Sequence, residues 1–362
     1  MAGFVGMRWA PGQFRYVIRT RERELLDESH SGTFAVSRSV HYGVFLVFEG
    51  IRFFVREEAG GLTVAFLNLQ LNLDRFRRGI AFNLPDHEQD LVPTADVLRD
   101  LFMEFLSQPE LRPFLLDMAR DEAQGYLRPF TVDDERAIGV TFPGNPTIRV
   151  VASRYDSYLG EPFHGVAVPW LVRTVGINQT GCLKLGGNYL LSVKAVQEAR
   201  RIRPDASSAL FLDDRPYDEL STRKITEWDS SCSLFAFTDG TVVRIPDNPL
   251  ILPSVTVRGL HRILTRVGVP VQERGLTYGE LVERAQAGEV VTVCSVGTAG
   301  VLSRCASLLL TDADRQPITL MESQREHPLY DALWAARAAY WDLYRGLGEP
   351  LDGITRTTHL LE

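Results

Sequence analysis

The first part of the chain mixes apolar patterns typical of strands and of helices. Residues 44–55 (VFLVFEGIRFFV) are rich in β-branched and aromatic side chains and predict a strand, and LTVAFLN (62–68) predicts a second one after the turn-forming EEAGG. In TADVLRDLFMEFLS (94–107) apolar residues recur at helical spacing behind a threonine that can cap the helix. YLRPFTV (126–132) indicates a strand in which Pro129 favours an edge position or a bend.

The second part of the chain contains the clearest helix pattern. Between Gly-Gly-Asn and Pro204, apolar residues of segment 186–204 recur every three or four positions, at Leu190, Val193, Val196, Ala199 and Ile202. Asp239-Gly240 lies between two apolar runs and predicts a hairpin. Further strands are predicted at 166–175, 208–214, 234–245 and 289–296, and further helices at 255–268 and 327–348. Strands and helices alternate without a strict βαβ order, which predicts α+β layers.

One polar segment predicts how the chain divides into domains. RYDSYLGEPFHG (154–165) is broken by glycine and proline, as connections between domains often are. We therefore expect a smaller α/β domain over residues 1–155, a connection over 156–164 and a larger α/β domain over 165–362.

Composition and charge exclude several classes of function. Of the 362 residues, 45% are hydrophobic and 23% charged, as in ordinary globular proteins. The formal net charge of −7 does not provide the positive field that non-specific nucleic-acid binding needs, so no nucleic-acid partner is expected. No apolar stretch reaches the ~18–20 residues of a membrane span, and the N-terminal segment lacks the apolar region of a signal peptide. A cytoplasmic protein without a membrane partner is expected.

Cysteine and histidine spacing does not favour a metal site. The four cysteines form no CxxC pair, and the seven histidines form no HExxH or HxH motif. These cysteines are Cys182, Cys232, Cys294 and Cys305. Four reduced thiols and no bound metal are expected.

Lysine is rare in this chain, which draws attention to the lysines that remain. Of 39 basic residues only Lys184, Lys194 and Lys224 are lysines, and arginine cannot replace an amine nucleophile. Lys184 lies between two leucines and before Gly186-Gly187; apolar neighbours lower a lysine pKa and expose the amine. The alternative is a lysine that extends from a strand end towards solvent. No motif surrounds Lys194 or Lys224, which favours the surface for both.

Other segments add groups that would suit pyridoxal 5′-phosphate. Glu227 ends a polar segment before an apolar run. Leu252-Pro253-Ser254-Val255-Thr256 opens a predicted helix, and Ser295-Val296-Gly297-Thr298-Ala299-Gly300 follows a predicted strand. A helix N-terminus and a glycine-containing turn with hydroxyls can bind a phosphate. A lysine, a carboxylate and two phosphate-binding segments are what this cofactor requires.

The chain resembles the class IV aminotransferases, the fold-type IV pyridoxal-phosphate enzymes, and among them most closely the branched-chain amino acid aminotransferases. Nine short segments occur in the family's order and near its spacing. They are His41-Tyr42-Gly43, Phe48-Glu49-Gly50-Ile51-Arg52, Asn72-Leu73-Asp74-Arg75, Tyr126-Leu127-Arg128-Pro129, Tyr158-Leu159-Gly160, Lys184 to Tyr189, Ile225-Thr226-Glu227, Leu252-Pro253 with Val255-Thr256, and Gly297-Thr298-Ala299. The resemblance implies two α/β domains with the cofactor in the cleft between them.

The resemblance also implies a role for each matching residue. Lys184 would hold the cofactor covalently and, once freed, move the proton at the substrate Cα. Glu227 would pair with the pyridine nitrogen, and Tyr189 would hydrogen-bond the phenolic oxygen. The phosphate would be bound by Arg75, Val255, Thr256 and Thr298. On the substrate side, the family implies Tyr42, Phe48, Tyr126, Arg128 and Ala299. Each has a structural alternative, such as a solvated helix face for Arg75, a core tyrosine for Tyr189, a turn cap for Glu227 or an ion pair for Arg128.

Two departures from the family pattern concern the substrate. The segment after Glu227, Trp228 to Phe235, is one residue longer than usual and lacks glycine, and the spacing between Tyr42 and Phe48 is one residue longer than in the family. Trp228 would either reshape the pocket or pack under the cofactor ring.

The resemblance implies an aminotransferase that moves an amino group between an apolar, branched-chain-like amino acid and a 2-oxo acid. Glutamate and 2-oxoglutarate would be the usual pair in a ping-pong reaction, and a homodimer is the family expectation. A second hypothesis keeps the cofactor but assigns a lyase or D-amino-acid transaminase reaction of specialised biosynthesis. A third hypothesis is a non-catalytic scaffold that retains the fold.

Overall fold

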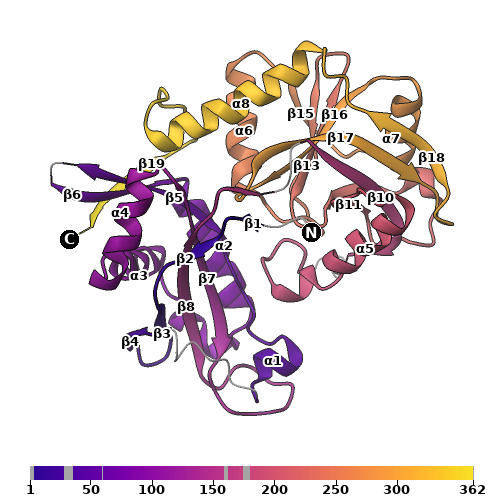
Figure 1. Ribbon diagram of the computed structural model, residues 1–362. Coiled ribbons are helices and arrows are strands. Elements are labelled where there is room, and N and C mark those ends of the chain that lie inside the picture. Colours follow the sequence, from indigo (N-terminus) through magenta and orange to yellow (C-terminus); the bar gives the residue numbers. More distant parts are fainter. Residues whose placement is uncertain (1–3, 28–35, 59, 159–161, 174–179, 362) are drawn as a thin grey trace.

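The computed structural model describes residues 4–27, 36–58, 60–158, 162–173 and 180–361, which form two sheets with helices packed on them (Figure 1). The first sheet has the order β19-β6-β5-β7-β8-β3-β4, with β2 beside β8. Its strands are β2 (Arg8–Trp9), β3 (Gln13–Val17), β4 (Arg23–Leu26), β5 (Ile51–Glu58), β6 (Gly61–Leu67), β7 (Gln124–Asp133), β8 (Pro146–Arg154) and β19 (Arg356–Leu361). The helices of this part are α1 (Arg38–Tyr42), α2 (Leu69–Phe82), α3 (Ala95–Leu106) and α4 (Arg112–Arg120).

The second sheet is mixed and has the order β12-β11-β10-β17-β16-β13-β14-β15, with β18 beside β17. Its strands are β10 (Phe163–Val172), β11 (Ser208–Leu212), β12 (Ile225–Trp228), β13 (Cys232–Phe237), β14 (Val242–Arg244), β15 (Val271–Glu273), β16 (Val290–Gly297), β17 (Val301–Thr311) and β18 (Pro317–Glu322). The helices are α5 (Ser192–Ile202), α6 (Val255–Arg266), α7 (Tyr278–Gln286) and α8 (Pro328–Arg345). A short pair, β1 (Phe4–Val5) with β9 (Ser157–Tyr158), completes the strands of the described chain.

The C-terminal strand crosses from one half of the molecule to the other. β19 pairs antiparallel with β6 over Arg356 to Leu361, so the end of the predicted 165–362 domain belongs to the first sheet. The remaining limits of the predicted division stay a prediction, and residues 159–161 of the predicted connection lie outside the described residues. α8 lies across both halves above the junction (Figure 1).

Several predicted elements are confirmed. The predicted helix over 94–107 is α3, and the Thr94 side chain caps it by accepting a hydrogen bond from the Val97 N–H. The Asp239-Gly240 hairpin joins β13 to β14, with Gly240 at a φ of 84° that favours glycine. The edge position predicted from Pro129 is wrong: β7 lies between β5 and β8, Pro129 pairs with Val150 of β8, and on the other side its carbonyl accepts from the Glu49 N–H at 2.8 Å.

The strand predicted over residues 44–55 is only partly correct. β5 begins at Ile51, whereas Val47 and Phe48 form isolated bridges to Leu185 and Phe130. The Phe48 N–H donates to the Lys184 carbonyl at 3.0 Å, so this segment pairs with the segment that carries the lysine.

The helix predicted over 186–204 has a different buried face from the predicted one. Residues Gly186–Tyr189 form a 3-10 turn, and α5 begins only at Ser192. Leu190 and Val193 are 71% and 81% exposed, while Ala195 and Ala199 pack in the small core against β10 and β11. Alanine allows the helix to lie close to the strands, which the hydrophobic pattern alone did not indicate.

Each half of the molecule is built around its own large cluster of buried apolar side chains. One contains β13, β16, β17, α6 and α8; the other contains β5, β6, β8, α2 and α3. α2 was not predicted, although Leu69, Leu73, Phe76 and Ile80 recur at helical spacing and are buried.

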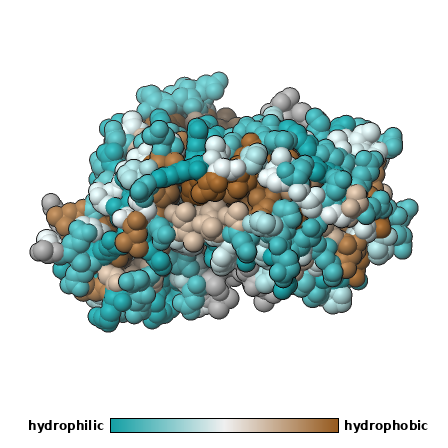
Figure 2. All heavy atoms as spheres, turned by 90° about the horizontal axis from the view of Figure 1, so that it is seen from above, coloured by the Kyte–Doolittle hydropathy of each residue, from teal (hydrophilic) through white to brown (hydrophobic). Residues whose placement is uncertain are grey.

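Seen from above, apolar side chains gather in a hollowed band in the middle of the molecule (Figure 2). Within the described chain, no helix is long and apolar enough to cross a membrane.

Candidate active site

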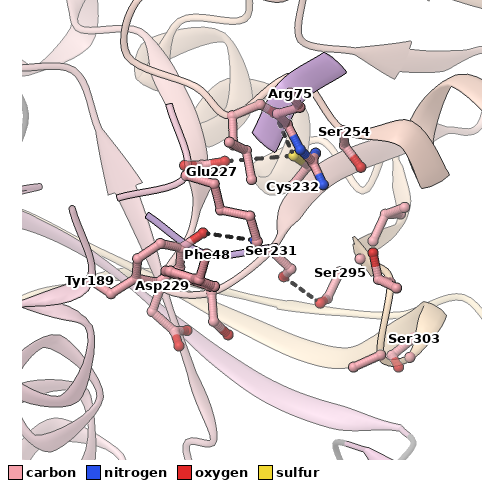
Figure 3. A pocket seen from close by; sticks show the side chains of 18 of the residues that line it. Phe48, Arg75, Tyr189, Glu227, Asp229, Ser231, Cys232, Ser254, Ser295 and Ser303 are labelled. Atoms are coloured by element: carbon pink, nitrogen blue, oxygen red, sulfur yellow. Dashed lines mark hydrogen bonds between the residues drawn. The ribbon is translucent and has the colours of Figure 1, made fainter. Parts of the chain in front are cut away.

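A cavity of about 450 Å³ is lined by side chains from both halves of the molecule. Phe48, Arg75, Tyr126 and Arg128 come from the first half, and Lys184, Tyr189 and Glu227 come from the second. Ten of the residues that line it are labelled in Figure 3. Residues that are far apart in the sequence, including most of those predicted for the site, therefore meet here.

Lys184 is partly buried in the wall of this cavity. Its Nζ donates a hydrogen bond to the Tyr189 hydroxyl at 3.2 Å and lies 4.8 Å from the centre of the Phe48 ring. Burial, and to a smaller extent the nearby Arg75 charge, lower the Lys184 pKa to about 8. The turn after the lysine is fixed by Asn188, whose side-chain amide donates to the carbonyls of Thr180 and Leu183. Lys194 and Lys224, in contrast, are exposed, as predicted.

Glu227 on β12 is buried next to an arginine that the sequence did not identify. Arg173, directly after β10, forms an ion pair with the Glu227 carboxylate, and its Nη1 also donates to the Leu250 carbonyl at 3.0 Å. The Cys232 thiol donates to the other Glu227 oxygen at 3.6 Å. Burial raises the pKa of Glu227, while the Arg173 charge opposes that rise. No motif surrounds Arg173, so only its position in space reveals it.

Arg75 on α2 is held by a carboxylate to which the sequence assigned no role. Its Nε and Nη2 donate to Glu49 at 2.7 and 2.6 Å, and its Nη1 donates to the Pro253 carbonyl at 2.7 Å. Both charges are buried; the attraction outweighs the cost of burial, so the Glu49 pKa is lowered. A guanidinium has five N–H donors, and these three bonds leave two for another acceptor.

The start of α6 lies beside Arg75. Ser254 caps the helix by accepting from the Val257 N–H, and Ser254 itself lines the cavity. The N–H groups of Val255 and Thr256 open the helix and so have no partner within it. Their side chains are buried and are not part of the cavity wall.

The turn between β16 and β17 forms another side of the cavity through Thr298, Ala299 and Gly300. Behind it, the Arg52 side chain donates to the carbonyls of Thr298 and Ala299. The Tyr155 hydroxyl donates to the Ala299 carbonyl at 2.8 Å. In a trans peptide the N–H points opposite to the C=O, so the Ala299 and Gly300 N–H groups point away from Arg52.

Three of the residues predicted on the substrate side lie together. The Arg128 guanidinium lies 4.7 Å from the Phe48 ring centre and 5.0 Å from the Tyr126 ring centre, and it donates to the Tyr126 hydroxyl at 3.0 Å. Tyr42 is not among them: it is half-exposed on α1, outside the wall of the cavity. α1 ends at Gly43 in a left-handed conformation (φ 69°), and this short helix leaves the tyrosine at the surface.

Part of the longer segment after Glu227 lines the cavity, but its tryptophan does not. Trp228 is fully buried away from the cavity, donates to the Cys294 carbonyl at 3.1 Å and packs edge-on against Phe163. Neither alternative considered for Trp228 therefore describes its position. Asp229, Ser230 and Ser231 do line the cavity.

Hydroxyls and a buried carboxyl therefore form part of that wall. The Ser231 hydroxyl lies 2.6 Å from the Ser295 hydroxyl, and Asp229 accepts hydrogen bonds from the Ser208 hydroxyl and the Ala209 N–H. Burial raises the pKa of Asp229. The four cysteines are free, and the described residues contain no cluster that could hold a metal ion.

Comparisons with known proteins agree with this arrangement. No family model matches the chain. A probable branched-chain-amino-acid aminotransferase of Staphylococcus aureus (strain N315) is 28% identical over 288 residues, 77% of this chain and 72% of its own length. Branched-chain-amino-acid transaminase 1 of Bacillus subtilis is 26% identical over 278 residues, 74% of this chain and 70% of its own.

Solved structures match nearly the whole chain. The branched-chain amino acid aminotransferase of Escherichia coli superposes with a TM-score of 0.67 at 20% identity, covering 97% of this chain and 99% of its own. The fold is that of the fold-type IV aminotransferases. The branched-chain amino acid aminotransferase of Thermobaculum terrenum, solved in its PLP-form, has a TM-score of 0.64 at 18% identity and covers 93% and 95% of the two chains. The predicted resemblance to class IV aminotransferases and the predicted fold class are thus confirmed.

Proposed function

We propose that this protein is a pyridoxal-phosphate-dependent aminotransferase that moves an amino group between an apolar, branched-chain-like amino acid and a 2-oxo acid. The observation that carries the proposal is Lys184, an amine with a pKa near 8 that projects into a cavity between a tyrosine hydroxyl and a buried arginine. Fold-type IV relatives named as branched-chain aminotransferases support the same activity.

The residues of the cavity fit this cofactor. Two unused N–H donors of Arg75 and the open N–H groups of Val255 and Thr256 suit the phosphate dianion, with Thr298 on the adjacent turn. Glu227 presents a buried carboxylate for the pyridine nitrogen, and Tyr189 presents a hydroxyl next to the lysine. When bound, the cofactor supplies an aldehyde that takes up the amino group and a ring that withdraws electron density from the substrate Cα.

The protein's own groups then have separate tasks. The Lys184 amine anchors the cofactor and, when free, takes and returns a proton at Nζ; a pKa near 8 leaves much of it unprotonated at mildly alkaline pH. The Arg173 charge opposes the rise of the Glu227 pKa caused by burial and so favours the carboxylate, the form that can accept a hydrogen bond from the ring nitrogen. Tyr126, Arg128 and the Ala299 N–H provide donors for substrate carboxylates, and Phe48 provides an apolar wall. Tyr42 could take part only if it moved from its surface position.

The 2-oxoglutarate/glutamate pair would be the usual partner in a ping-pong cycle.

We also propose a homodimer, because the loop between β7 and β8 exposes Ile138, Val140 and Phe142, with Val140 79% exposed. Free cysteines support a reducing compartment, and we propose the cytoplasm.

The proposal is tested by incubating purified, cofactor-loaded protein with L-leucine and 2-oxoglutarate and measuring glutamate by mass spectrometry. Glutamate formation at a rate above that of the Lys184→Ala variant is expected. No glutamate despite bound cofactor would contradict the aminotransferase and favour the lyase or D-amino-acid alternative, to be distinguished by a panel of amino acids of both configurations. A protein that shows no cofactor absorbance, with or without Lys184, would be the non-catalytic scaffold.

A titration of the three lysines checks the environment of Lys184 directly. In cofactor-free protein, reductive methylation with ¹³C-formaldehyde gives few NMR signals, because the chain has only three lysines. The signal that is missing from a Lys184→Met variant is expected to titrate near pH 8, since burial disfavours the ammonium. Between pH 8 and the ordinary lysine pKa the unfolded chain binds a proton that the folded chain does not, so this group's contribution to stability rises with pH there. A Lys184 signal that titrates at the ordinary lysine pKa would contradict the buried environment.

A further inference from the structure

A second cavity of about 500 Å³ lies behind the turn that closes the first one. Its wall is made by the start of β7, the end of β8 and one face of α8, where the two halves of the molecule meet. The cavity shares no lining residue with the first cavity, and the proposed function gives it no role.

Three contacts join the second cavity to the Thr298–Gly300 turn. The Tyr155 hydroxyl in its wall donates to the Ala299 carbonyl, and the Arg337 Nε in its wall donates to the Gly300 carbonyl at 3.4 Å. The Arg52 guanidinium lies 4.2 Å from the centre of the Trp341 ring, which is also in this wall. The same guanidinium donates to the Thr298 and Ala299 carbonyls. A ligand that displaced these side chains would change the position of the turn.

The wall of this cavity carries charges of both signs around an aromatic ring. Arg337, Trp341 and Arg345 follow one another at four-residue spacing and so lie on one face of α8. Arg345 forms no ion pair within the described chain, and its buried Nε has no hydrogen-bond partner there. The Arg154 charge in the wall, by contrast, is already paired with Asp121 at 2.6 Å.

Further carboxylates lie in the same wall, two of them outside α8 and a third, Asp342, on α8 three residues before Arg345. Glu122 and Asp156 flank the start of β7 and the end of β8; both residues are exposed and form no ion pair among the described residues, and one Asp156 carboxylate oxygen lies against Gly6. Phe54 adds an apolar face, packed edge-on against Trp341 with the ring centres 5.7 Å apart. An unpaired guanidinium, unpaired carboxylates and aromatic surface together suit a small zwitterion with an apolar side chain.

We propose that this second cavity binds a free apolar amino acid and that its occupation weakens substrate binding in the first cavity. The ligand carboxylate binds Arg345 and draws Arg337 from the Gly300 carbonyl, the ammonium group binds Glu122 or Asp156, and the side chain packs on Trp341. The turn then holds the substrate carboxylate less well, so KM rises while kcat is unchanged. The inference rests on the proposed function for its effect on KM, but not for binding itself.

The test separates the two cavities by blocking the first one. Cofactor-loaded protein is mixed with L-leucine and reduced with borohydride, so that the reduced cofactor–leucine adduct fills the first cavity; after free leucine is removed, L-leucine is titrated into the protein by calorimetry. Saturable binding of one leucine per chain is expected, with 4-methylvalerate and isopentylamine, each lacking one of the two charges, binding at least about tenfold more weakly. No saturable binding of leucine, or equal binding of the three probes, would overturn the proposal.

Two matched variants identify the cavity. Arg345→Gln is expected to weaken leucine binding to the blocked protein about tenfold, whereas Arg201→Gln on the distant α5 leaves it within about twofold. In unblocked protein, a non-substrate zwitterion such as cycloleucine is expected to raise KM, and Arg345→Gln to remove the rise. Equal effects of the two variants would overturn the assignment. Leucine binding without any transaminase activity would leave the site standing while the proposed function failed.

Discussion

Replacing Lys184 by alanine is expected to reduce transamination by at least about 10³-fold, because the variant loses both the amine that anchors the cofactor and the group that moves the proton. Among the residues that the structure describes, the Lys184 amine forms no ion pair, and it donates a hydrogen bond to the Tyr189 hydroxyl. The variant should therefore fold, with a thermal transition close to that of the parent. Glutamate production and the thermal transition are measured on the same preparations.

Lys194→Ala is the matched control, because Lys194 is an exposed lysine on α5 whose ammonium contacts Glu198 and Gln197 of the same helix. Its activity should equal that of the parent. Borohydride reduction of yellow, freshly purified protein followed by peptide mapping should find the modification at Lys184. Full activity of Lys184→Ala, or a reduced cofactor attached to Lys194 or Lys224, would refute the proposed chemistry.

Replacing Glu227 by glutamine is expected to lower kcat by about 10²–10³-fold, the usual loss when one buried electrostatic contact to a reacting group is removed. The same change leaves the Arg173 guanidinium buried without its counter-charge. Removing one partner of a buried ion pair costs about 3–5 kcal/mol of folding free energy. Activity and stability should therefore fall together in this variant.

A double variant separates the two losses. Glu227→Gln with Arg173→Met removes both buried charges, so it should recover much of the stability while the activity stays low. Chemical denaturation gives the stability and single-turnover kinetics the rate. If the double variant regained activity as well, Glu227 would have only a structural role with Arg173.

Much of the secondary structure followed from local pattern. The cap at Thr94 and the hairpin at Asp239-Gly240 were predictable because each depends on residues within a few positions of one another. The buried face of α5 was not predictable in this way. Leu190 and Val193 fit a helical pattern but are exposed, because the helix packs on the strands through its alanines. Trp228 likewise was assigned to the cavity by its neighbours in sequence but packs in the core.

By itself, the sequence determined the chemical inventory of this protein: one lysine in an apolar segment, a carboxylate and two anion-binding segments, in the order of a known family. Each of these features lies within a short segment, so it can be identified from the sequence alone. Only the tertiary structure decided which charges are paired. Glu49 meets Arg75, Arg173 meets Glu227, and Arg52 reaches a turn 246 residues away. Such pairings depend on how the sheets bring distant segments into one low-dielectric space, where an unpaired charge is costly, and no spacing along the chain encodes them.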